Sequence, residues 1–330
     1  MFEEQIERRL RGRADGEPPK NDFLDLLLDH RGAEDGKAFD RQTLLSLLTD
    51  LFSAGSETTS ATVEWAMAEL LQNPSTMAKA RDELAQVIGS KPEIEESDMG
   101  ELKYLQAIVK ETFRLHPPAP LLLPRQAETT SEIGGYEVPK GARVLVNVWA
   151  IGRDSKVWPD PEKFLPERFL EGEIDFRGRY FELAPFGSGR RMCPGMPLAV
   201  RMVHLMLACL LHRFDWRLPA DVEKNGLDMT EKFGTILSLK TPLHAVASVN
   251  RRPKIDNVVA TNRSSVNKEN AKYVCRCIDR VPNLELRGLV VDADDARISL
   301  YTGRGIELRS EILVREPQQQ AGLPHGHVPQ

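Results

Sequence analysis

The clearest hydrophobic pattern in the chain runs from about residue 41 to residue 71. Its apolar positions follow the i, i+3, i+4, i+7, i+8 spacing of one helix face, and they are Leu44, Leu47, Leu48, Leu51 and Phe52. Asn73 and Pro74 close the segment, because the residue before a proline disfavours α-helical backbone. The pattern therefore predicts one long helix with an apolar face.

Shorter patterns flank this helix. The first twenty residues are typical of a helix end followed by a loop. Helices are predicted at about 22–29, 76–89, 102–115 and 197–214, the last with Leu198, Met202, Leu205 and Cys209 facing inward. Residues 133–150 (IGGYEVPKGARVLVNVWA) alternate apolar and polar positions between glycine-bearing turns, which predicts strands and hairpins. We expect a mainly α fold with small β-sheets, of the α+β class.

Composition and charge narrow the class of protein. The 330 residues are 41% hydrophobic and 28% charged, and 44 basic against 49 acidic residues leave a net charge of -5. This balance argues against a general nucleic-acid binder. The four cysteines are irregularly spaced, which favours a reducing compartment over a disulfide framework. No apolar run reaches the roughly 18–20 residues of a membrane span, so we expect no anchor or targeting segment in the chain as written.

The character of the sequence changes after about residue 250. A polar, linker-like stretch leads to short β-like runs such as LELRGLVVDA, and the final EPQQQAGLPHGHVPQ is typical of disorder. We therefore predict one domain at 1–247 and an unassigned linker and tail at 248–330. Cys275 and Cys277 lack the second cysteine pair of a zinc site. His325 and His327 lie in too flexible a context to argue for metal ligation.

The apolar face of the long helix contains an anomaly. By helical spacing the face continues through Gly55, Thr58, Thr59 and Thr62, where leucines would be expected. One interpretation is a kink, because an interior glycine costs about 1 kcal/mol relative to alanine and a hydroxyl can bond back to a carbonyl. The other is a widened groove, where a small ligand lies beside the Thr58 hydroxyl and the Glu57 carboxylate, which could relay protons.

Two other clusters carry candidate chemistry. Residues 186–195, FGSGRRMCPG, place Cys193 among glycines and arginines and just before an apolar helix, whose positive N-terminal end favours a thiolate. Glu111 and Arg114 lie three residues apart on a predicted helix, and Arg168 in FLPERF offers a second guanidinium. A carboxylate between two arginines predicts a buried structural network.

The motifs AGSET, ETFR, PERF and FGSGRRMCPG occur in this order along the chain. Together they resemble the haem-thiolate cytochrome P-450 monooxygenases, and the flanking KETFRLHPPAPLLLPR is similar to the plant microsomal branch, especially the terpenoid (geraniol-type) hydroxylases. The resemblance covers residues 1–247 and implies the C-terminal, haem-binding portion of that fold. The membrane anchor and early helices of the family are not represented.

The resemblance implies a role for each motif. Cys193 would ligate the haem iron, Arg191 and Arg125 would hold its propionates, and Phe186, Gly189 and Gly195 would shape the loop around the porphyrin. Ala54 and Gly55 would leave room for dioxygen, with Glu57 and Thr58 delivering protons. Glu111, Arg114 and Arg168 would form a structural triad. Substrate contacts would come from Leu51, Ala54, Leu121, Leu122, Phe233 and Ile236.

The implied reaction inserts one oxygen atom from dioxygen into a lipophilic small molecule, a terpenoid-like plant secondary metabolite. Electrons would come from NADPH through a diflavin reductase at the cytosolic face of the endoplasmic reticulum membrane, and Arg190, Arg201 and His204 are candidates for its docking face. A relative that rearranges peroxides is disfavoured because Thr58 and the cysteine loop are intact. The other alternative is an inactive fragment, or a helical interaction module without haem. Family members are longer, so we expect the isolated chain to be marginally stable or prone to aggregation.

Overall fold

The computed structural model describes residues 2–33, 36–89, 91, 93–249, 289–292, 297–301 and 307–311. The described α-helices are α1 (Phe2–Ala14), α2 (Phe23–Asp29), α3 (Arg41–Gln72), α4 (Pro74–Val87), α5 (Lys103–Leu115), α6 (Val148–Ile151), α7 (Met196–Arg213) and α8 (Ala220–Asn225). Short 3-10 helices are η1 (Glu96–Gly100), η2 (Pro166–Phe169) and η3 (Gly189–Arg191). The remaining elements are short strands.

The strands form small antiparallel sheets. The two-stranded pairs are β1 (Arg125–Gln126) with β4 (Arg143–Val144), β2 (Ser131–Ile133) with β3 (Tyr136–Val138), β5 (Phe214–Arg217) with β8 (Val246–Val249), and β6 (Glu231–Phe233) with β7 (Leu237–Leu239). In the tail, β10 (Arg297–Tyr301) lies between β9 (Leu289–Asp292) and β11 (Glu307–Glu311). The predicted fold class, mainly α with small sheets, is confirmed. Cys275, Cys277, His325 and His327 lie outside the described residues.

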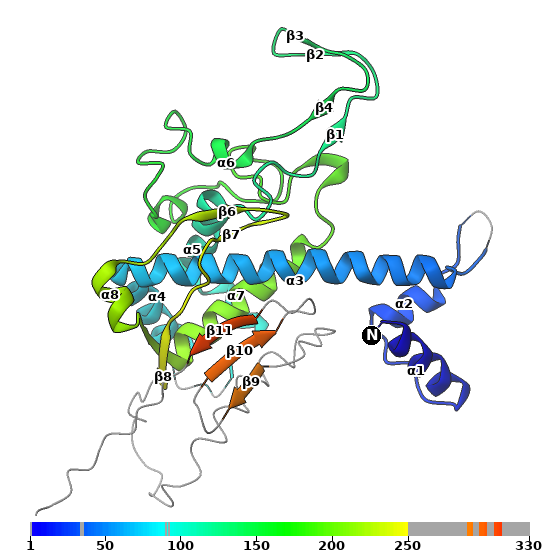
Figure 1. Ribbon diagram of the computed structural model, residues 1–330, viewed down its shortest axis with the longest axis horizontal. Coiled ribbons are helices and arrows are strands. Elements are labelled where there is room, and N and C mark those ends of the chain that lie inside the picture. The colour runs from blue at the N-terminus through cyan, green and yellow to red at the C-terminus, as the bar shows by residue number, and fades with distance from the viewer. Residues whose placement is uncertain are drawn as a thin grey trace, which may run out of the picture.

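Helix α3 is the longest described element; α1 and α2 lie near its N-terminal end, and α4, α5 and α7 pack along its C-terminal half (Figure 1). It begins where the Asp40 carboxylate accepts a hydrogen bond from the backbone N–H of Thr43, at 2.8 Å. It ends at Asn73, and Pro74 opens α4, a position where proline loses no intrahelical hydrogen bond. The predicted long helix is therefore confirmed, with α4 starting two residues earlier than expected.

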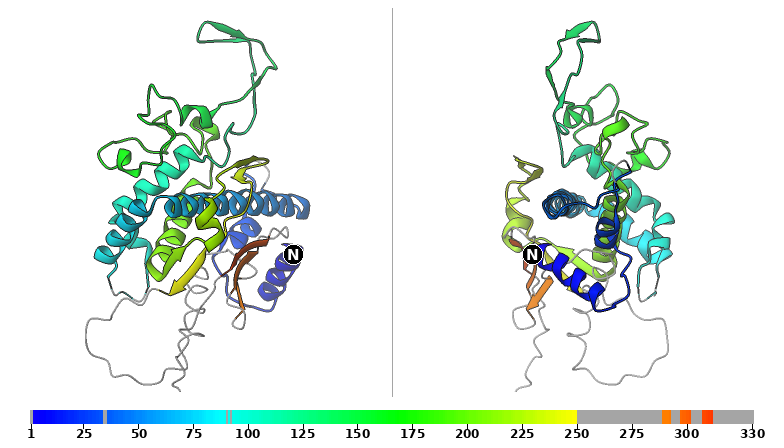
Figure 2. Two further views of the ribbon diagram at one scale, coloured as in Figure 1. Left: turned by 60° about the vertical axis from the view of Figure 1, so that its left-hand side comes forward. Right: turned by 90° about the vertical axis from the view of Figure 1, so that its right-hand side faces the viewer.

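Burial along α3 increases from its N-terminal to its C-terminal half. Leu44 belongs to a small cluster with Ile6 of α1 and Leu27 of α2, whereas Leu70 lies in the main core. Fully buried apolar side chains from α3, α4, α5 and α7 fill that core, among them Leu70, Leu84, Leu105, Ile108, Leu207 and Leu211. The middle of α3 therefore crosses from the main body to a satellite formed by α1 and α2 (Figures 1 and 2).

Two details differ from the sequence predictions. Residues 148–150 belong to helix α6 and not to a strand, because the Asn147 side chain caps the backbone N–H of Ala150 at 2.9 Å. In α7, Met202 is buried as predicted, but Leu198 is 50% exposed, and the buried face also contains Val203 and Leu207. The sequence of α7 is apolar almost all round, so its spacing did not single out the buried side.

Helix α7 also satisfies the length and composition expected of a membrane span, alone among the described helices. Its Val203, Leu207 and Leu211 are at most 1% exposed and pack with α3, α4 and α5 in the main core. We therefore assign α7 to the core of the domain.

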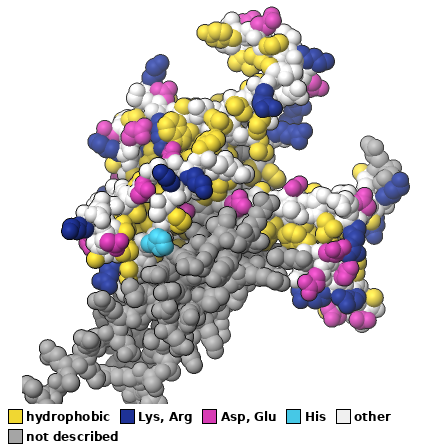
Figure 3. Space-filling view, viewed as in Figure 1, with side chains coloured by type: hydrophobic (Ala, Val, Ile, Leu, Met, Phe, Trp, Pro, Cys, Tyr) yellow, Lys and Arg dark blue, Asp and Glu magenta, His cyan; other side chains and the backbone are white. Residues whose placement is uncertain are grey.

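The β2–β3 hairpin projects away from the body (Figures 1 and 2). Its turn is made by Gly134 and Gly135, both with positive φ, as a tight two-residue hairpin turn requires. Ile133 and Tyr136 flank the turn and are exposed, and hydrophobic side chains gather at this tip (Figure 3).

Candidate active site

The Cys193 loop crosses the surface immediately before α7. The thiol of Cys193 is exposed, and its backbone N–H donates to the carbonyl of Phe186 at 3.0 Å, which closes the loop. Gly187 and Gly189 have φ of +70° and +67°, conformations that side-chain-bearing residues rarely adopt. A Cβ at Gly195 would lie 3.7 Å from Cys193 Sγ. The glycines therefore permit the turn and leave the thiol uncovered.

Aromatic packing attaches this loop to the core. The ring of Phe186 makes an edge-on contact with Phe113 of α5, with centroids 5.1 Å apart, and a second with Phe176 at 5.9 Å. Edge-to-face pairs of this kind add to the stabilisation from burial. The start of the cysteine loop is thus held by α5, the helix that also carries Glu111 and Arg114.

Residues 118–125 form an arm beside the cysteine loop. Leu122 in this arm has a φ of +51°, an uncommon conformation for a branched side chain. A Cβ on Gly187 would lie 3.5 Å from Leu122 Cδ1 and 4.0 Å from a terminal nitrogen of Arg125. The arm and the loop, some sixty residues apart in sequence, are therefore neighbours.

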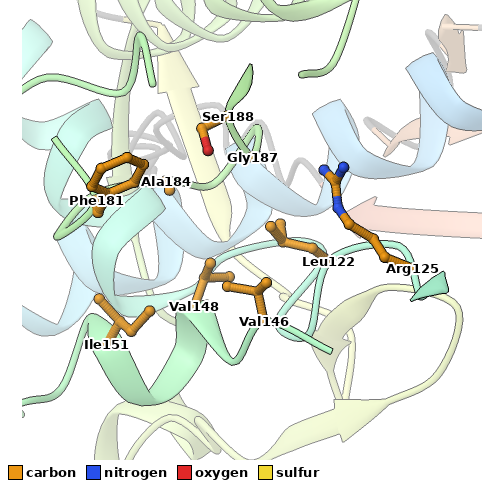
Figure 4. A pocket seen from close by; sticks show the side chains of 9 residues that line it. All are labelled: Leu122, Arg125, Val146, Val148, Ile151, Phe181, Ala184, Gly187 and Ser188. Atoms are coloured by element: carbon orange, nitrogen blue, oxygen red, sulfur yellow. The ribbon is translucent and has the colours of Figure 1, made fainter. Parts of the chain in front are cut away.

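A cavity of about 320 Å³ lies between the arm, α6 and the loop (Figure 4). Leu122 lines it, whereas the next residue, Leu123, is 83% exposed. The lining is mostly apolar and consists of Leu122, Arg125, Val146, Val148, Ile151, Phe181, Ala184, Gly187 and Ser188. Sequence reasoning missed Val146, Ile151 and Phe181, because they come from separate segments that no local motif connects.

On α3, the anomalous segment is partly exposed and its backbone is regular. Residues 54–58 lie within one unbroken α-helix, so the helix shows neither a break nor a widened turn there. Ala54 and Gly55 are exposed, and a Cβ added to Gly55 would meet nothing within 4 Å. The Thr58 hydroxyl donates to the Ala54 carbonyl at 2.7 Å. Small side chains, and not a distorted backbone, create the open surface.

The Glu111 carboxylate lies between two arginines, as the sequence predicted. Arg114 donates to it through Nε and Nη2, both at 2.8 Å, and Arg168 Nε donates to Glu111 Oε1 at 3.0 Å. The side chains of Glu111 and Arg114 are completely buried. The backbone N–H of Leu165 also donates to Glu111, and Arg114 donates to the carbonyls of Gly152, Pro161 and Lys163. The network therefore fastens residues 152–168 to α5.

The remaining candidates lie in different surroundings. Leu51 is 44% exposed on α3, Phe233 is 65% exposed on the β6–β7 hairpin, and Leu121 and Ile236 are half-buried. Arg190 is exposed, and Arg201 is exposed but forms a 2.9 Å ion pair with Glu96.

His204 was expected on a docking face, and that expectation is wrong. The side chain is buried, with Nδ1 2.6 Å from the Val200 carbonyl, and burial lowers the pKa of the ring. It sits on the inner side of α7, which the all-round apolar sequence of that helix did not indicate.

Comparison with known proteins agrees with this arrangement of motifs. The family model described as Cytochrome P450 matches residues 1–245 of the chain. The chain belongs to the cytochrome P450 family.

Plant members of this family are close in sequence. Cytochrome P450 76T24 of Catharanthus roseus is 54% identical over 248 residues, covering 74% of this chain and 49% of that protein. Geraniol 8-hydroxylase of Catharanthus roseus is 53% identical, over 75% of this chain and 49% of its own length. Carnosic acid synthase of Rosmarinus officinalis is 49% identical, over 74% and 49%. The P450 chain thus spans about half the length of the curated relatives it matches.

The exposed side chains of this P450 chain fit a haem group. Cys193 is a free, exposed cysteine whose thiol could bind an iron atom. Among the described residues, Arg125 and Arg191 are exposed and lack any ion pair or side-chain hydrogen bond, so both are free to hold carboxylates. One thiolate and two forked cations are the donors that an iron porphyrin with two propionate arms requires.

Proposed function

We propose that this chain is the haem-binding portion of a haem-thiolate monooxygenase, with residues 1–247 as its domain and Cys193 as the iron ligand. The observation that carries the proposal is the exposed Cys193 thiol, held in a glycine-shaped loop at the start of α7 with unpaired arginines on this loop and on the neighbouring arm. The loop lies within the segment that matches the family model.

The chain's own residues would prepare the site for the cofactor. Cys193 would offer Sγ to the iron close to the start of α7, where the positive end of the helix dipole favours an anionic ligand. Arg191 and Arg125 orient the group by donating to its carboxylates. When bound, a thiolate-ligated haem supplies the redox chemistry that cleaves dioxygen.

The exposed middle of α3 supports a role in oxygen binding and proton delivery. Ala54 and Gly55 leave the helix surface open for a small ligand. Thr58 Oγ1 donates to the Ala54 carbonyl, so its oxygen can still accept a hydrogen bond from a water molecule and hold that water at the site. Glu57 has no hydrogen-bond or ion-pair partner among the described residues, which leaves its carboxyl group available to pass protons to that water.

We infer a lipophilic, terpenoid-like substrate. Exposed apolar side chains on three separate segments support this, namely Leu51 on α3, Leu123 on the arm and Phe233 on the β6–β7 hairpin. Two relatives named geraniol 8-hydroxylase point to the same chemical class. By the same resemblance, electrons come from NADPH through a diflavin reductase at the endoplasmic reticulum membrane, with exposed Arg190 as a docking candidate.

The deciding experiment is a carbon monoxide difference spectrum of the full chain, produced with haem precursor and reduced with dithionite. A red-shifted Soret band is expected, and it should disappear in Cys193→Ala. Cys209→Ala is the matched control, because Cys209 is half-buried against the core and should not affect the band. No band in the unaltered chain, or a band that persists in Cys193→Ala, would mean that this chain is an inactive relative without thiolate-ligated haem.

A further inference from the structure

His116, the first residue after α5, is buried against α3. Its ring stacks on Trp65, with centroids 3.9 Å apart and planes within 3°, and Nε2 lies 2.7 Å from Glu69 Oε1. Only 5% of His116 and none of Trp65 is exposed. A buried hydrogen bond between an imidazole and a carboxylate is costly to leave unmade, so these contacts hold the end of α5 tightly to α3.

The other ring nitrogen of His116 faces a second carboxylate. Nδ1 is 3.6 Å from Glu231 Oε1, at the start of β6. Glu231 also accepts from Trp149 Nε1 at 3.0 Å and from Arg153 at 3.2 Å, both contributed by the α6 region. The His116 imidazole thus lies between the carboxylates of Glu69 on α3 and Glu231 on β6. Glu231 in turn accepts hydrogen bonds from the α6 region.

The backbone around this cluster connects the segments proposed to contact substrate. The Pro118 carbonyl, two residues after His116, accepts from the N–H of Leu237 in β7 at 2.9 Å. Trp65 Nε1 donates to the Leu237 carbonyl at 3.2 Å. The Pro120 carbonyl accepts from the N–H of Trp149 at 3.2 Å. The arm, the β6–β7 hairpin and α3 therefore meet at His116.

We propose that His116 is a positioning residue that sets the substrate pocket. It fixes the arm at 118–125 and the hairpin turn carrying Phe233 and Ile236 at defined places relative to α3. This inference rests on the proposed function, because the arm and the hairpin turn contact substrate only if that function is correct. The Glu111 network fastens residues 152–168, which include Arg153, but none of its hydrogen bonds goes to His116 itself.

Amide hydrogen exchange on the full chain tests the positioning without cofactor or substrate. His116→Phe keeps a ring to stack on Trp65 but loses the bond to Glu69. We expect the Leu237 and Trp149 amides to exchange roughly ten- to a hundredfold faster, the ratio that corresponds to a lost hydrogen bond involving a charged group. His116→Gln can still donate to Glu69 and should restore most of the protection.

The matched control is Glu64→Leu, on the same helix, because leucine removes the acceptor. Glu64 accepts from the backbone N–H of Leu243 at 2.9 Å and does not contact the arm, so only the Leu243 amide should exchange faster. Two results would overturn the proposal. One is amide exchange in His116→Phe that is faster to the same degree throughout α4, α5 and α7, and the other is unchanged exchange at Leu237 and Trp149.

Substrate binding supplies a second readout, using geraniol as the probe and the Soret shift of the haem-loaded chain. His116→Phe should weaken geraniol binding about tenfold or more at unchanged haem content, with recovery in His116→Gln. Faster exchange of the Leu237 and Trp149 amides in His116→Phe, together with an unchanged affinity for geraniol, would show that His116 does not set the substrate pocket. A chain that takes up no haem would instead refute the proposed function, while the exchange data would still decide whether His116 positions the arm.

Discussion

Glu111 shows how burial turns an ordinary side-chain pair into a structural requirement. An i, i+3 contact with Arg114 on a helix surface would contribute a few tenths of a kcal/mol. Here both side chains are completely buried, and Arg168 and the Leu165 N–H add further donors. The negative charge of Glu111 is therefore needed to compensate the positive charges of the Arg114 and Arg168 guanidinium groups, which are largely removed from solvent.

We accordingly expect Glu111→Gln to lower the free energy of unfolding by about 3–5 kcal/mol, because two arginines would lose their counter-charge. Urea denaturation followed by circular dichroism measures the change. Lys79→Ala is the control, since the Lys79–Glu167 pair is largely exposed and should be worth at most about 1 kcal/mol. Equal effects of the two substitutions would contradict the assignment.

Asp25 supplies a pH-dependent contact between α1 and α2. Burial raises the pKa of its carboxyl, but hydrogen bonds from Arg9 and Arg13 outweigh burial and lower the pKa from 3.8 to about 2. A lowered pKa means that the contact stabilises the fold above pH 3.8 and is lost as the pH falls toward 2. Amide exchange in α1 and α2 should therefore accelerate across that interval.

Asp25→Asn isolates this contribution, because the amide cannot titrate. At neutral pH the variant should exchange faster in α1 and α2 than the unaltered chain, and the difference should shrink as the pH approaches 2. A difference that stays constant over the interval would show that the Asp25 charge does not hold the two helices together.

Helix α3 combines a packing role with an exposed, proposed functional surface. Its C-terminal half is buried in the main core, whereas Leu51, Ala54 and Gly55 are exposed. A glycine inside a helix reduces helix stability, and no neighbouring atom requires Gly55 to lack a side chain. The presence of glycine at position 55 is explained if a small ligand binds to this open surface, as we propose for dioxygen.

Gly55→Ala should therefore stabilise the chain by about 1 kcal/mol, the propensity difference in a helix interior, and should lower oxygenase turnover by occupying the open surface. Thermal melting of the chain measures the first effect. Gly152→Ala is the control and should instead lower the melting temperature, because a Cβ there would collide with the Arg114 carbonyl. A loss of stability in Gly55→Ala would mean that the backbone at this position needs glycine.

Across the described molecule, large hydrophobic side chains remain exposed on several elements. Leu26, Leu123, Phe181 and Phe233 are each at least 65% exposed, and hydrophobic side chains are visible over much of the surface in Figure 3. Each square ångström of apolar surface covered is worth about 25 cal/mol. Contacts that cover these side chains are therefore favourable.

We expect the isolated chain to self-associate in a concentration-dependent way, because association would cover this apolar surface. Light scattering over a dilution series measures the effect, and Phe181→Ser with Leu123→Ser should reduce it. A monomer that melts in one sharp cooperative transition at high concentration would contradict the expectation.

Local sequence patterns were enough to predict the longer helices α3, α4, α5 and α7. Helical spacing and proline punctuation predicted α3 and α5 closely, and the resemblance to the P450 family agreed with the matched family model. These features depend on interactions within a few residues, or on motifs whose spacing is fixed. The Glu111–Arg114 pair was predictable for the same reason, since the two residues lie three apart on one helix, whereas Arg168, 57 residues away, was predicted from its own motif, FLPERF.

Tertiary packing decided which faces are buried and which distant residues meet. Spacing did not indicate that Leu198 is exposed and His204 buried, because α7 is apolar on most of its sides. The contact of Leu122 with the cysteine loop, and the place of His116 between two carboxylates, join segments 47 or more residues apart. Such contacts exist only once the core places α3, α5 and the strands side by side, and so only the folded structure reveals them.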